Sequence, residues 1–321
     1  MSSFWKRTFN HLDEQLALAH LALVPERPAL LVFMFHVLFE DEAAMAQGLV
    51  DPQQRITTRV FAEFVAYYQA HGYAFVTPAQ VLGGLDSTRK YALITFDDGY
   101  YNNRLALPIL RQFGVPATFF ISTHHVQAGE AFWWDVVYRG RQRQPLPPAA
   151  QQAEYALLKQ LRHPDITQYL LAHFGPAALQ PVGDLDRPFT PTELAAFARE
   201  PEVVLGNHTA HHAILTNYAP PAAGHELAEG QQYLVQLTGS EISAVAYPNG
   251  NTSAAVVAAA RGAGLRLGTT VQAGKNYLPF ALHHVDMLLL KRFLLWGDRD
   301  VQRQCTLFRT DFHLKQLLRP A

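Results

Sequence analysis

Short apolar runs recur along the chain, and each gives way to glycine or to polar residues. Runs with the length of a buried strand occupy residues 29–39, 92–95, 117–122, 203–205 and 244–247. Between them lie segments that are predicted to be helical, at 59–71, 105–113 and 226–238. This alternation predicts a parallel sheet with helices packed outside it, in a domain of the α/β class.

The pair Asp97-Asp98 follows one of these runs directly and precedes Gly99. Because α/β folds place their chemistry at the carboxyl ends of strands, both carboxylates are expected at an active-site edge. Two adjacent buried charges are costly unless a cation binds beside them, which indicates a metal site. For an isolated Asp-Asp-Gly, an ordinary surface turn would be the better interpretation.

A second cluster of polar residues favours a metal site over a surface turn. The sequence His-Thr-Ala-His-His occupies residues 208–212, after another short apolar run that contains a glycine. His208 and His212 are four residues apart, so one helical turn would place both imidazoles on the same side. With Asp98 they would form a two-histidine, one-carboxylate set that suits zinc or another divalent ion. Since the chain has 15 histidines, a chance pair at this spacing is the alternative.

The order of these motifs resembles that of the polysaccharide deacetylase family, the NodB-like members of carbohydrate esterase family 4. Further segments carry the same resemblance, and they lie at residues 33–36, 61–73, 101–120, 132–135 and 246–250. The similarity spans residues 30–290, and the Ala-Tyr-Pro at 246–248 is typical of one branch of the family.

The resemblance implies a distorted, incomplete (β/α)7-type barrel whose chemistry lies at the carboxyl ends of the strands. It also implies a metal-dependent hydrolase that removes N-acetyl groups from amino sugars of a poly- or oligosaccharide. Asp98, His208 and His212 would bind the divalent metal, with Zn²⁺ expected and Co²⁺ or Ni²⁺ as alternatives, and Asp97 would be the general base. A deformylase or another amidohydrolase on a lipid-linked or small-molecule substrate would use the same metal set. A non-catalytic carbohydrate-binding protein is a third alternative.

Other site residues follow from the matched segments. Tyr247, Pro248 and Asn249 would line the substrate groove, and the Asn249 amide would stabilise the oxyanion, because proline has no N–H. Trp133 and Trp134 suit stacking on sugar rings, although packing of the segment that contains them explains them equally well.

Two positions depart from the family pattern. Many members carry an arginine where this chain has Ala246, so Asp97 loses an expected partner. The Ala-Tyr-Pro branch has a later Leu-Pro-Arg-Ile, and the match at residues 282–285 puts His284 in place of its arginine. Residues 282–284 fit literally the Leu-x-His motif by which the family supplies its general acid, so the resemblance makes His284 the candidate general acid. His36, which ends the first strand, would line the mouth of the site or form a hydrogen bond at the strand end.

The chain is expected to divide into an N-terminal helical extension (1–28), a deacetylase-like domain (29–300) and a C-terminal helical tail (301–321). A helical insertion at about 126–190 interrupts the alternation of strands and helices, and we expect it to fold over the mouth of the barrel.

The family resemblance implies an N-acetylated saccharide as the partner, and charge and composition bear on the other classes of partner. A formal net charge of −1 gives no electrostatic case for a nucleic-acid partner. The first 24 residues lack the pattern of a secretory signal, and the run at 29–39 is too short to span a bilayer. A cytoplasmic location is therefore expected. The aromatic and basic residues 4–7 make a weak case for contact with a membrane surface. The single Cys305 excludes an internal disulfide, and the oligomeric state is left open.

Overall fold

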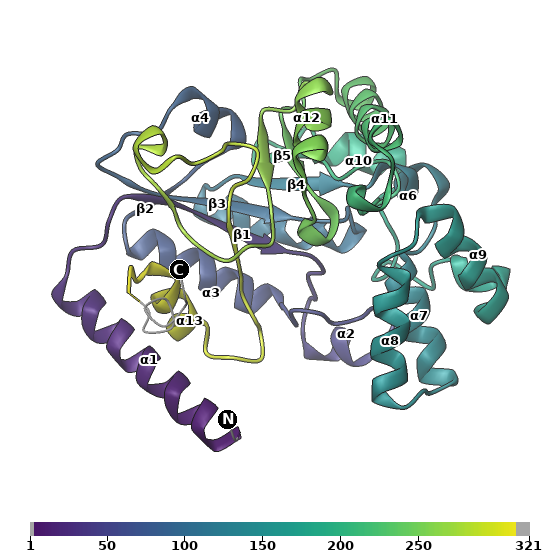
Figure 1. Ribbon diagram of the computed structural model, residues 1–321, viewed down its shortest axis with the longest axis horizontal. Coiled ribbons are helices and arrows are strands. Elements are labelled where there is room, and N and C mark those ends of the chain that lie inside the picture. The colour runs from purple at the N-terminus through teal and green to yellow at the C-terminus, as the bar shows by residue number, and fades with distance from the viewer. Residues whose placement is uncertain (1–2, 313–321) are drawn as a thin grey trace.

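A nearly closed barrel of seven short parallel strands lies at the centre of the molecule (Figure 1). The computed structural model describes residues 3–312, with side chains from residue 12 onward. The strands are β1 (Ala29–Phe35), β3 (Lys90–Phe96), β4 (Ala117–Ile121), β5 (Val203–Asn207), β6 (Ala244–Ala246), β7 (Leu267–Thr269) and β9 (Arg292–Leu294). They pair in the order β7-β6-β5-β4-β3-β1, and β9 also pairs with β1.

The barrel closes through the stretch that precedes β9. Leu290 forms a parallel bridge with Thr269 of β7, and the Gly268 N–H donates to the Met287 carbonyl at 2.7 Å. The same stretch then enters β9, where Arg292 pairs with Val32 of β1. The incomplete (β/α)7-type barrel that the family resemblance implies is therefore confirmed. Because these strands are parallel, their carboxyl ends form one rim.

Two further strands extend the sheet at the opposite end. β2 (Tyr73–Phe75) pairs with the first residues of β3, and β8 (Asn276–Tyr277) runs antiparallel to the start of β1. Both strands therefore lie at the amino ends of the barrel strands, away from the carboxyl rim.

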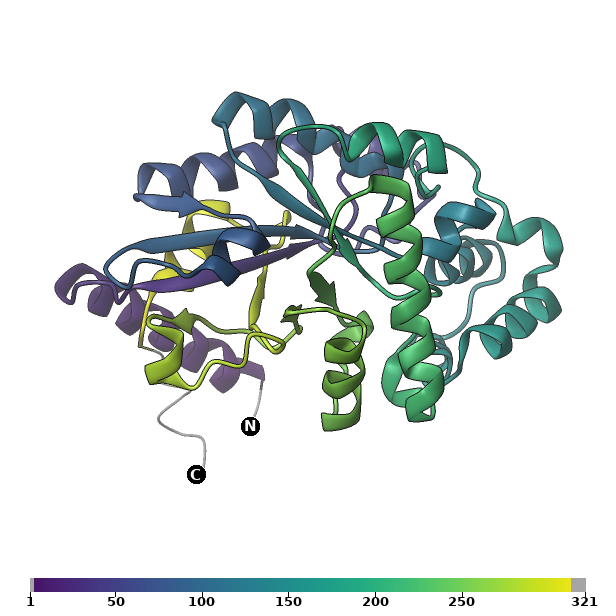
Figure 2. The same cartoon turned by 90° about the horizontal axis from the view of Figure 1, so that it is seen from above.

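Helices cover the outside of the barrel (Figures 1 and 2). They are α2 (Glu42–Ala46), α3 (Thr58–Ala70), α4 (Pro78–Gly83), α5 (Leu107–Phe113), α6 (Thr123–Ala128), α10 (Pro191–Phe197), α11 (Pro220–Thr238) and α12 (Ala254–Gly262). α3 shows how local sequence sets this layer. The Thr57 side chain caps it by accepting from the Val60 N–H, and Phe61 and Phe64 pack on Phe35 of β1.

The segment between β4 and β5 contains a three-helix insertion, seen at one side of the barrel in Figures 1 and 2. Its helices are α7 (Trp133–Arg143), α8 (Pro148–Leu158) and α9 (His163–Phe174). Val137, Leu158 and Leu170 form a small core between them. An ion pair of 2.5 Å between Arg139 and the fully buried Asp186 fixes the end of this segment.

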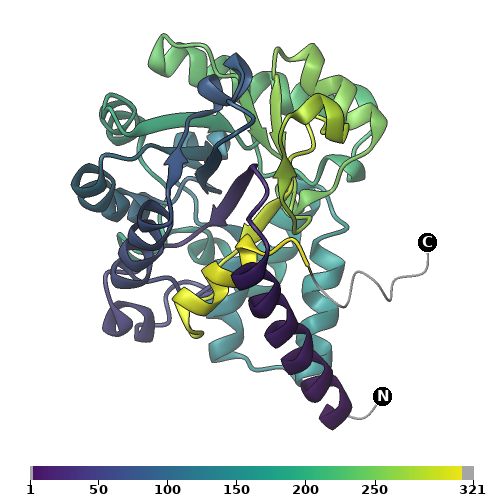
Figure 3. The ribbon, with the colours of Figure 1, turned by 90° about the vertical axis from the view of Figure 1, so that its left-hand side faces the viewer.

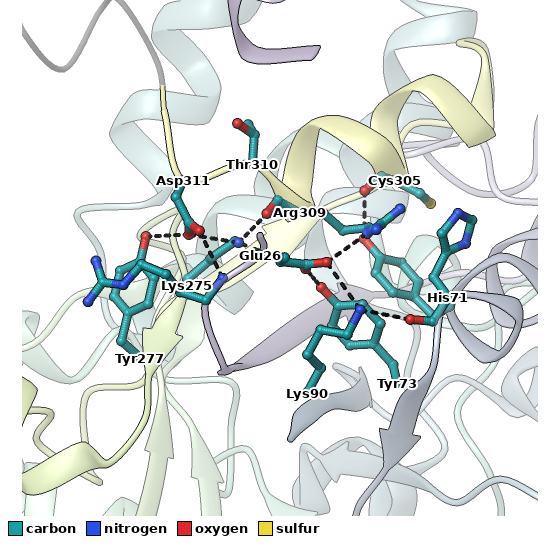
Figure 4. Close-up of polar contacts among 12 residues, drawn as sticks. Glu26, His71, Tyr73, Lys90, Lys275, Tyr277, Cys305, Arg309, Thr310 and Asp311 are labelled. Carbon is teal, nitrogen blue, oxygen red and sulfur yellow. Dashed lines mark hydrogen bonds and ion pairs between the residues drawn. The ribbon is translucent and has the colours of Figure 1, made fainter. Parts of the chain in front are cut away.

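The two ends of the chain meet at the amino side of the barrel. α13 (Val301–Arg309) packs against both α3 and α1 (Ser3–Leu23), as Figure 3 shows. Figure 4 shows the polar network that connects them. Glu26 pairs with Lys90 and Arg309, and Asp311 pairs with Lys275 at 2.9 Å. The predicted C-terminal tail lies outside the described residues from position 313 on, as do the side chains of residues 4–7. None of the described helices is both long and apolar enough to cross a membrane.

Candidate active site

The two acidic residues of the central strand lie at the carboxyl rim, where the sequence places them. β3 ends at Phe96, so Asp97 and Asp98 are the first residues beyond it, and both are buried. Asp98 has a left-handed backbone with φ of 79°, which turns its side chain away from the strand's alternation. Its carbonyl accepts from the Ser122 N–H of the next strand end at 3.1 Å, which fixes this turn.

The histidine motif forms an irregular loop after β5. The helical turn expected at 208–212 is wrong, because Thr209 and His212 both have left-handed backbones, with φ of 64° and 52°. In this loop, side-chain oxygens accept hydrogen bonds from backbone N–H groups, as backbone carbonyls would in a helix. Asn207 Oδ1 accepts from the Thr209 N–H at 2.7 Å, and Thr209 Oγ1 accepts from the Ala213 N–H at 2.8 Å. The loop still brings both imidazoles to the same point.

Asp98, His208 and His212 meet in a compact cluster. Asp98 Oδ1 lies 3.4 Å from His208 Nε2 and 3.3 Å from His212 Nε2. Two donors bound to one tetrahedral zinc at about 2.0–2.1 Å lie about 3.3–3.4 Å apart. The spacing of the side chains therefore fits a small divalent ion.

Hydrogen bonding around the cluster supports the same fit. His208 Nδ1 donates to the Ala246 carbonyl at 2.7 Å, which leaves Nε2 unprotonated and directed at Asp98. Asp98 Oδ2 and His212 Nδ1 are buried and lack a hydrogen-bond partner among the described residues. An unpaired buried carboxylate oxygen is costly, and a bound cation would remove that cost.

The charges inside the cluster shift each group's pKa. Burial raises the pKa of Asp98, but the His208 and His212 imidazoles beside it outweigh this and keep the carboxyl well below its ordinary pKa. Burial lowers the pKa of His212 below its ordinary value despite Asp98. For His208 burial acts in the same direction, but Asp98 and Asp97 reverse it and raise the pKa. Asp98 is thus held ionised, as a metal ligand must be.

Asp97 has a partner that the sequence interpretation missed. Arg292 of β9 donates to both carboxylate oxygens, at 2.7 and 2.8 Å, and its side chain is completely buried. Burial raises the pKa of Asp97, but Arg292 and then His208 outweigh this and hold it below its ordinary value. The arginine lost at Ala246 is therefore supplied from another strand, and the expectation that Asp97 lacks this partner is wrong.

A signal for Arg292 was present in the sequence. Leu290-Lys291-Arg292-Phe293 matches the Leu-Pro-Arg-Ile pattern at its arginine, eight residues after the match that selected His284. The structure places His284 after η5 (Phe280–His283), with an exposed side chain. The neighbouring His283 ring lies 5.6 Å from that of Tyr277, which pairs with the first residue of β1. His284 thus lies at the amino side of the barrel, away from the metal cluster, and the structure gives no support for it as the acid.

A pocket of about 260 Å³ opens over the cluster. Several predicted site residues line it, and these are His36, Asp98, Trp133, Trp134, His212 and Asn249. Pattern reasoning missed further lining residues, which are Asp51, Gln53, Tyr155, Lys159 and Ile214. Tyr155 and Lys159 belong to the insertion, which therefore contributes to the lining of the pocket.

Two predicted substrate contacts do not line the pocket. The Tyr247 side chain is buried in the core beside α12, and its hydroxyl lies where a side chain on Gly268 would be. Pro248 is buried at the start of η4 (Pro248–Gly250). Asn249 reaches the pocket because its left-handed backbone, with φ of 57°, turns the chain back toward the rim.

The tryptophan pair contributes to both packing and the pocket. Trp134 is largely buried, and its ring lies 4.5 Å from that of His212. Its Nε1 donates to Tyr100 Oη at 2.6 Å, and Tyr100 in turn donates to the buried Asp135. Burial raises the pKa of Asp135 well above its ordinary value. This chain of hydrogen bonds fixes the Trp134 ring against His212, while Trp133 is more accessible.

His36 is held by an amide with a defined orientation. Gln54 Nε2 donates to the carbonyls of Met34 and Leu295, at 2.8 and 3.0 Å. Its Oε1 therefore accepts from His36 Nδ1 at 2.8 Å. This bond leaves Nε2 as the free nitrogen of a ring that lines the pocket.

Comparison with known proteins agrees with this architecture. The family described as polysaccharide deacetylase matches residues 84–268, and no curated protein sequence matches the chain. The fold is similar to that of the Streptococcus pyogenes deacetylase PplD in complex with acetate (17% identity, 88% of this chain, 99% of that chain, TM-score 0.59). It is also similar to IcaB from Ammonifex degensii (18%, 89%, 99%, TM-score 0.59) and to a de-N-acetylase from Aggregatibacter actinomycetemcomitans (13%, 87%, 99%, TM-score 0.60). The family match covers more than half of the chain, which therefore belongs to the polysaccharide deacetylase family, hydrolases that act on carbon–nitrogen bonds other than peptide bonds.

Proposed function

We propose that this protein removes N-acetyl groups from amino sugars of a poly- or oligosaccharide in a metal-dependent reaction. The observation that carries the proposal is the pairing of a metal-ligand cluster with an adjacent, non-ligating carboxylate. Asp98 contacts the two histidines, whereas Asp97 forms an ion pair with Arg292. Neighbouring carboxylates with different partners can perform different tasks.

Asp98, His208 and His212 would hold the divalent cation, with Zn²⁺ as the ion that suits this donor set. When bound, such an ion polarises the acyl oxygen of the substrate and lowers the pKa of water. Trp134 and the Ala246 carbonyl contribute by fixing the orientation of the two imidazoles.

Asp97 would accept the proton of the attacking water. Arg292 keeps its carboxylate ionised at neutral pH and fixes both oxygens. The water oxygen then forms a bond with the acyl carbon, and the oxyanion that results accepts a hydrogen bond from the Asn249 amide. Loss of one such donor typically lowers the rate by about 10²–10³.

His36 would protonate the amine that leaves. Its Nδ1 is committed to Gln54, so Nε2 is the nitrogen that can exchange a proton in the pocket. As an imidazolium, His36 would give that proton to the amine while the bond from nitrogen to the acyl carbon breaks. The products would be acetate and a free amino sugar.

The lining of the pocket supports a saccharide. Trp133 and Tyr155 provide aromatic surface, and Asp51 and Lys159 provide hydrogen-bonding groups. Aromatic rings cover the apolar faces of pyranoses, and polar side chains at the edge bind their hydroxyl groups.

The test combines metal content with acetate release from N-acetylglucosamine oligomers. We expect Asp97→Asn to lower turnover by at least about 10²-fold while metal stays bound, and His208→Ala to lose both metal and activity. Loss of metal from Asp97→Asn would contradict the division of roles. Formylated amino sugars are assayed beside the acetylated ones, because release of formate without acetate would identify a deformylase. Sugar binding without either product would indicate a non-catalytic protein. The cytoplasmic location stays a prediction, which cell fractionation can test.

A further inference from the structure

A second cluster of imidazoles lies beside the candidate active site and does not line its pocket. His124, His163 and His211 each offer a ring nitrogen, and these three atoms lie within 4.8 Å of one another. The ring centroids are 4.4 Å apart for His124 and His211, 4.6 Å for His163 and His211, and 5.1 Å for His124 and His163. Side chains that are far apart in the sequence thus converge on one point.

The three histidines come from three separate elements. His124 lies in α6, His163 is the first residue of α9 in the insertion, and His211 lies in the loop after β5. α6 and α9 lie on the same side of the barrel in Figure 1, and α11 packs against α6. Each side chain is half-buried, so the cluster is open to solvent on one side.

A carboxylate holds one of these rings in the orientation of a metal ligand. Glu226 of α11 is largely buried and accepts from both the backbone N–H and Nδ1 of His211, each at 3.0 Å. Nε2 of His211 is therefore the nitrogen left for the cluster. Metal-binding histidines are commonly oriented by a carboxylate on their other nitrogen.

The charges around the cluster favour a cation. Glu130 Oε2 lies 3.8 Å from His124 Nε2, and the charges of Glu226 and Glu229 also interact electrostatically with the His124 ring. Burial, together with His211 and His124, lowers the pKa of His163 to about 4, so its ligand form is present at neutral pH. Three ring nitrogens that lie close together, with carboxylates beside His124 and His211, suit a metal ion.

We propose that His124, His163 and His211 form a second metal site, which binds a zinc-class divalent ion and fastens the helical insertion to the loop that carries the catalytic ligands. Three histidines with one open position form a tetrahedral zinc set once water occupies that position. The rings are more widely spaced than in a filled site, so we expect them to turn inward on binding. The proposal does not depend on the reaction, because none of the three side chains lines the pocket.

The position of the site suggests what it does. His211 precedes the catalytic-site residue His212, and α9 belongs to the insertion that contributes Tyr155 to the pocket wall. The Tyr218 hydroxyl already accepts from the His163 backbone N–H at 2.9 Å, so the contact between loop and insertion exists without an ion. A metal ion would stiffen this contact, and removal of the His163 side chain leaves the backbone bond in place.

The number of bound zinc ions tests the proposal. The full-length protein is stripped with a chelator and titrated with zinc alone, and bound metal is measured by elemental analysis after desalting. We expect two equivalents for the wild type, one for His163→Ala, one for His208→Ala and none for the double variant. His173→Ala is the matched control, since His173 lies in α9 outside the cluster and bonds the Tyr169 carbonyl. It should retain two equivalents.

The proposal would be overturned if His163→Ala bound as much zinc as the wild type. It would also be overturned if the wild type bound a single equivalent that is lost in His208→Ala and kept in His163→Ala. A single equivalent that only His163→Ala removes would support this site and contradict the metal role proposed for the active site. His124→Gln provides a second variant on another element, should His163→Ala fail to fold by circular dichroism. Glu226→Gln should weaken zinc binding at this site by about 10–100-fold, and unchanged affinity would count against it. In His208→Ala, zinc should raise the melting temperature, and the additional His163→Ala change should abolish that rise.

Discussion

Replacing Arg292 with methionine would leave the Asp97 carboxylate buried without its bidentate partner. Methionine fills much of the same volume, so the change removes charge and hydrogen bonds more than packing. The guanidinium also donates to the Thr270 carbonyl at 2.8 Å and to Thr95 Oγ1 at 3.2 Å. The substitution therefore affects three groups at the carboxyl rim at once.

The burial of both partners sets the size of the effect. Arg292 is completely buried and the Asp97 side chain is 3% exposed. Removal of one partner of a buried ion pair typically destabilises a protein by about 3–5 kcal/mol, because the other charge stays buried. With an unfolding entropy of about 2.1 cal/mol/K per residue, a chain of 321 residues would lose roughly 4–7 °C of melting temperature.

The pH dependence follows from the pKa of Asp97. Its folded pKa is held below the ordinary value, so the pair stabilises the protein above the unfolded pKa of about 4, and this stabilisation is lost as the pH falls through the folded pKa. In Arg292→Met, burial dominates and the pKa rises. We expect the acidic limb of kcat/KM to move upward by about 1–3 pH units, because the base must be ionised to act.

Thermal melts at pH 7 and deacetylation rates across pH measure both effects. Arg266→Met is the matched control, since its pair with Glu241 is exposed and should contribute at most about 1 kcal/mol. The double variant Asp97→Asn/Arg292→Met should lose less stability than the sum of the losses in the two single variants, by roughly 2–3 kcal/mol. A melting temperature within about 1–2 °C of wild type, together with an unmoved acidic limb, would refute the role given to Arg292.

Two further substitutions test parts of the fold outside the pocket. Gly268→Ala would place a Cβ 2.4 Å from the Leu288 carbonyl oxygen, and we expect a loss of about 1–3 kcal/mol in melts because backbone must move. Gly262→Ala, which meets no atom within 4 Å, is its control and should be neutral or stabilising. Lys275→Met should cost roughly 2–4 kcal/mol by leaving Asp311 without its buried cation. Its kcat should match that of wild type, and a large loss would show that this network affects the active site.

Long apolar runs made much of the fold predictable from the sequence. β1 consists of seven buried residues, and β3 has six buried residues out of seven, so their core runs are visible without any partner. The closing strands are different. β7 and β9 have three residues each, too few for a period of two to be recognised. These strands exist because neighbours across the barrel supply their hydrogen bonds.

The candidate site likewise contains residues that the sequence identified and residues that it did not. Asp98, His208 and His212 could be found from local spacing, even though the loop that presents the histidines is irregular and not helical. Pocket residues such as Asp51 and Lys159 carry no pattern of their own, since one lies in an irregular loop and the other at a helix end. Their role depends on how the insertion meets the barrel, which no local sequence feature encodes.

Arg292 shows that a long-range partner can still leave a trace in the sequence. It lies 195 residues from Asp97, so no local spacing connects them. Yet Lys291 and Arg292 interrupt an otherwise apolar stretch at residues 288–295. Of two adjacent charges in a strand, alternation turns one inward, and a guanidinium in a core is tolerated only opposite a carboxylate. An adjacent pair of acidic residues at the end of another strand offers such a carboxylate. Matching charged residues inside apolar runs by sign therefore connects the basic pair at 291–292 with the acidic pair at 97–98, and the structure shows that Arg292 and Asp97 are the two that meet.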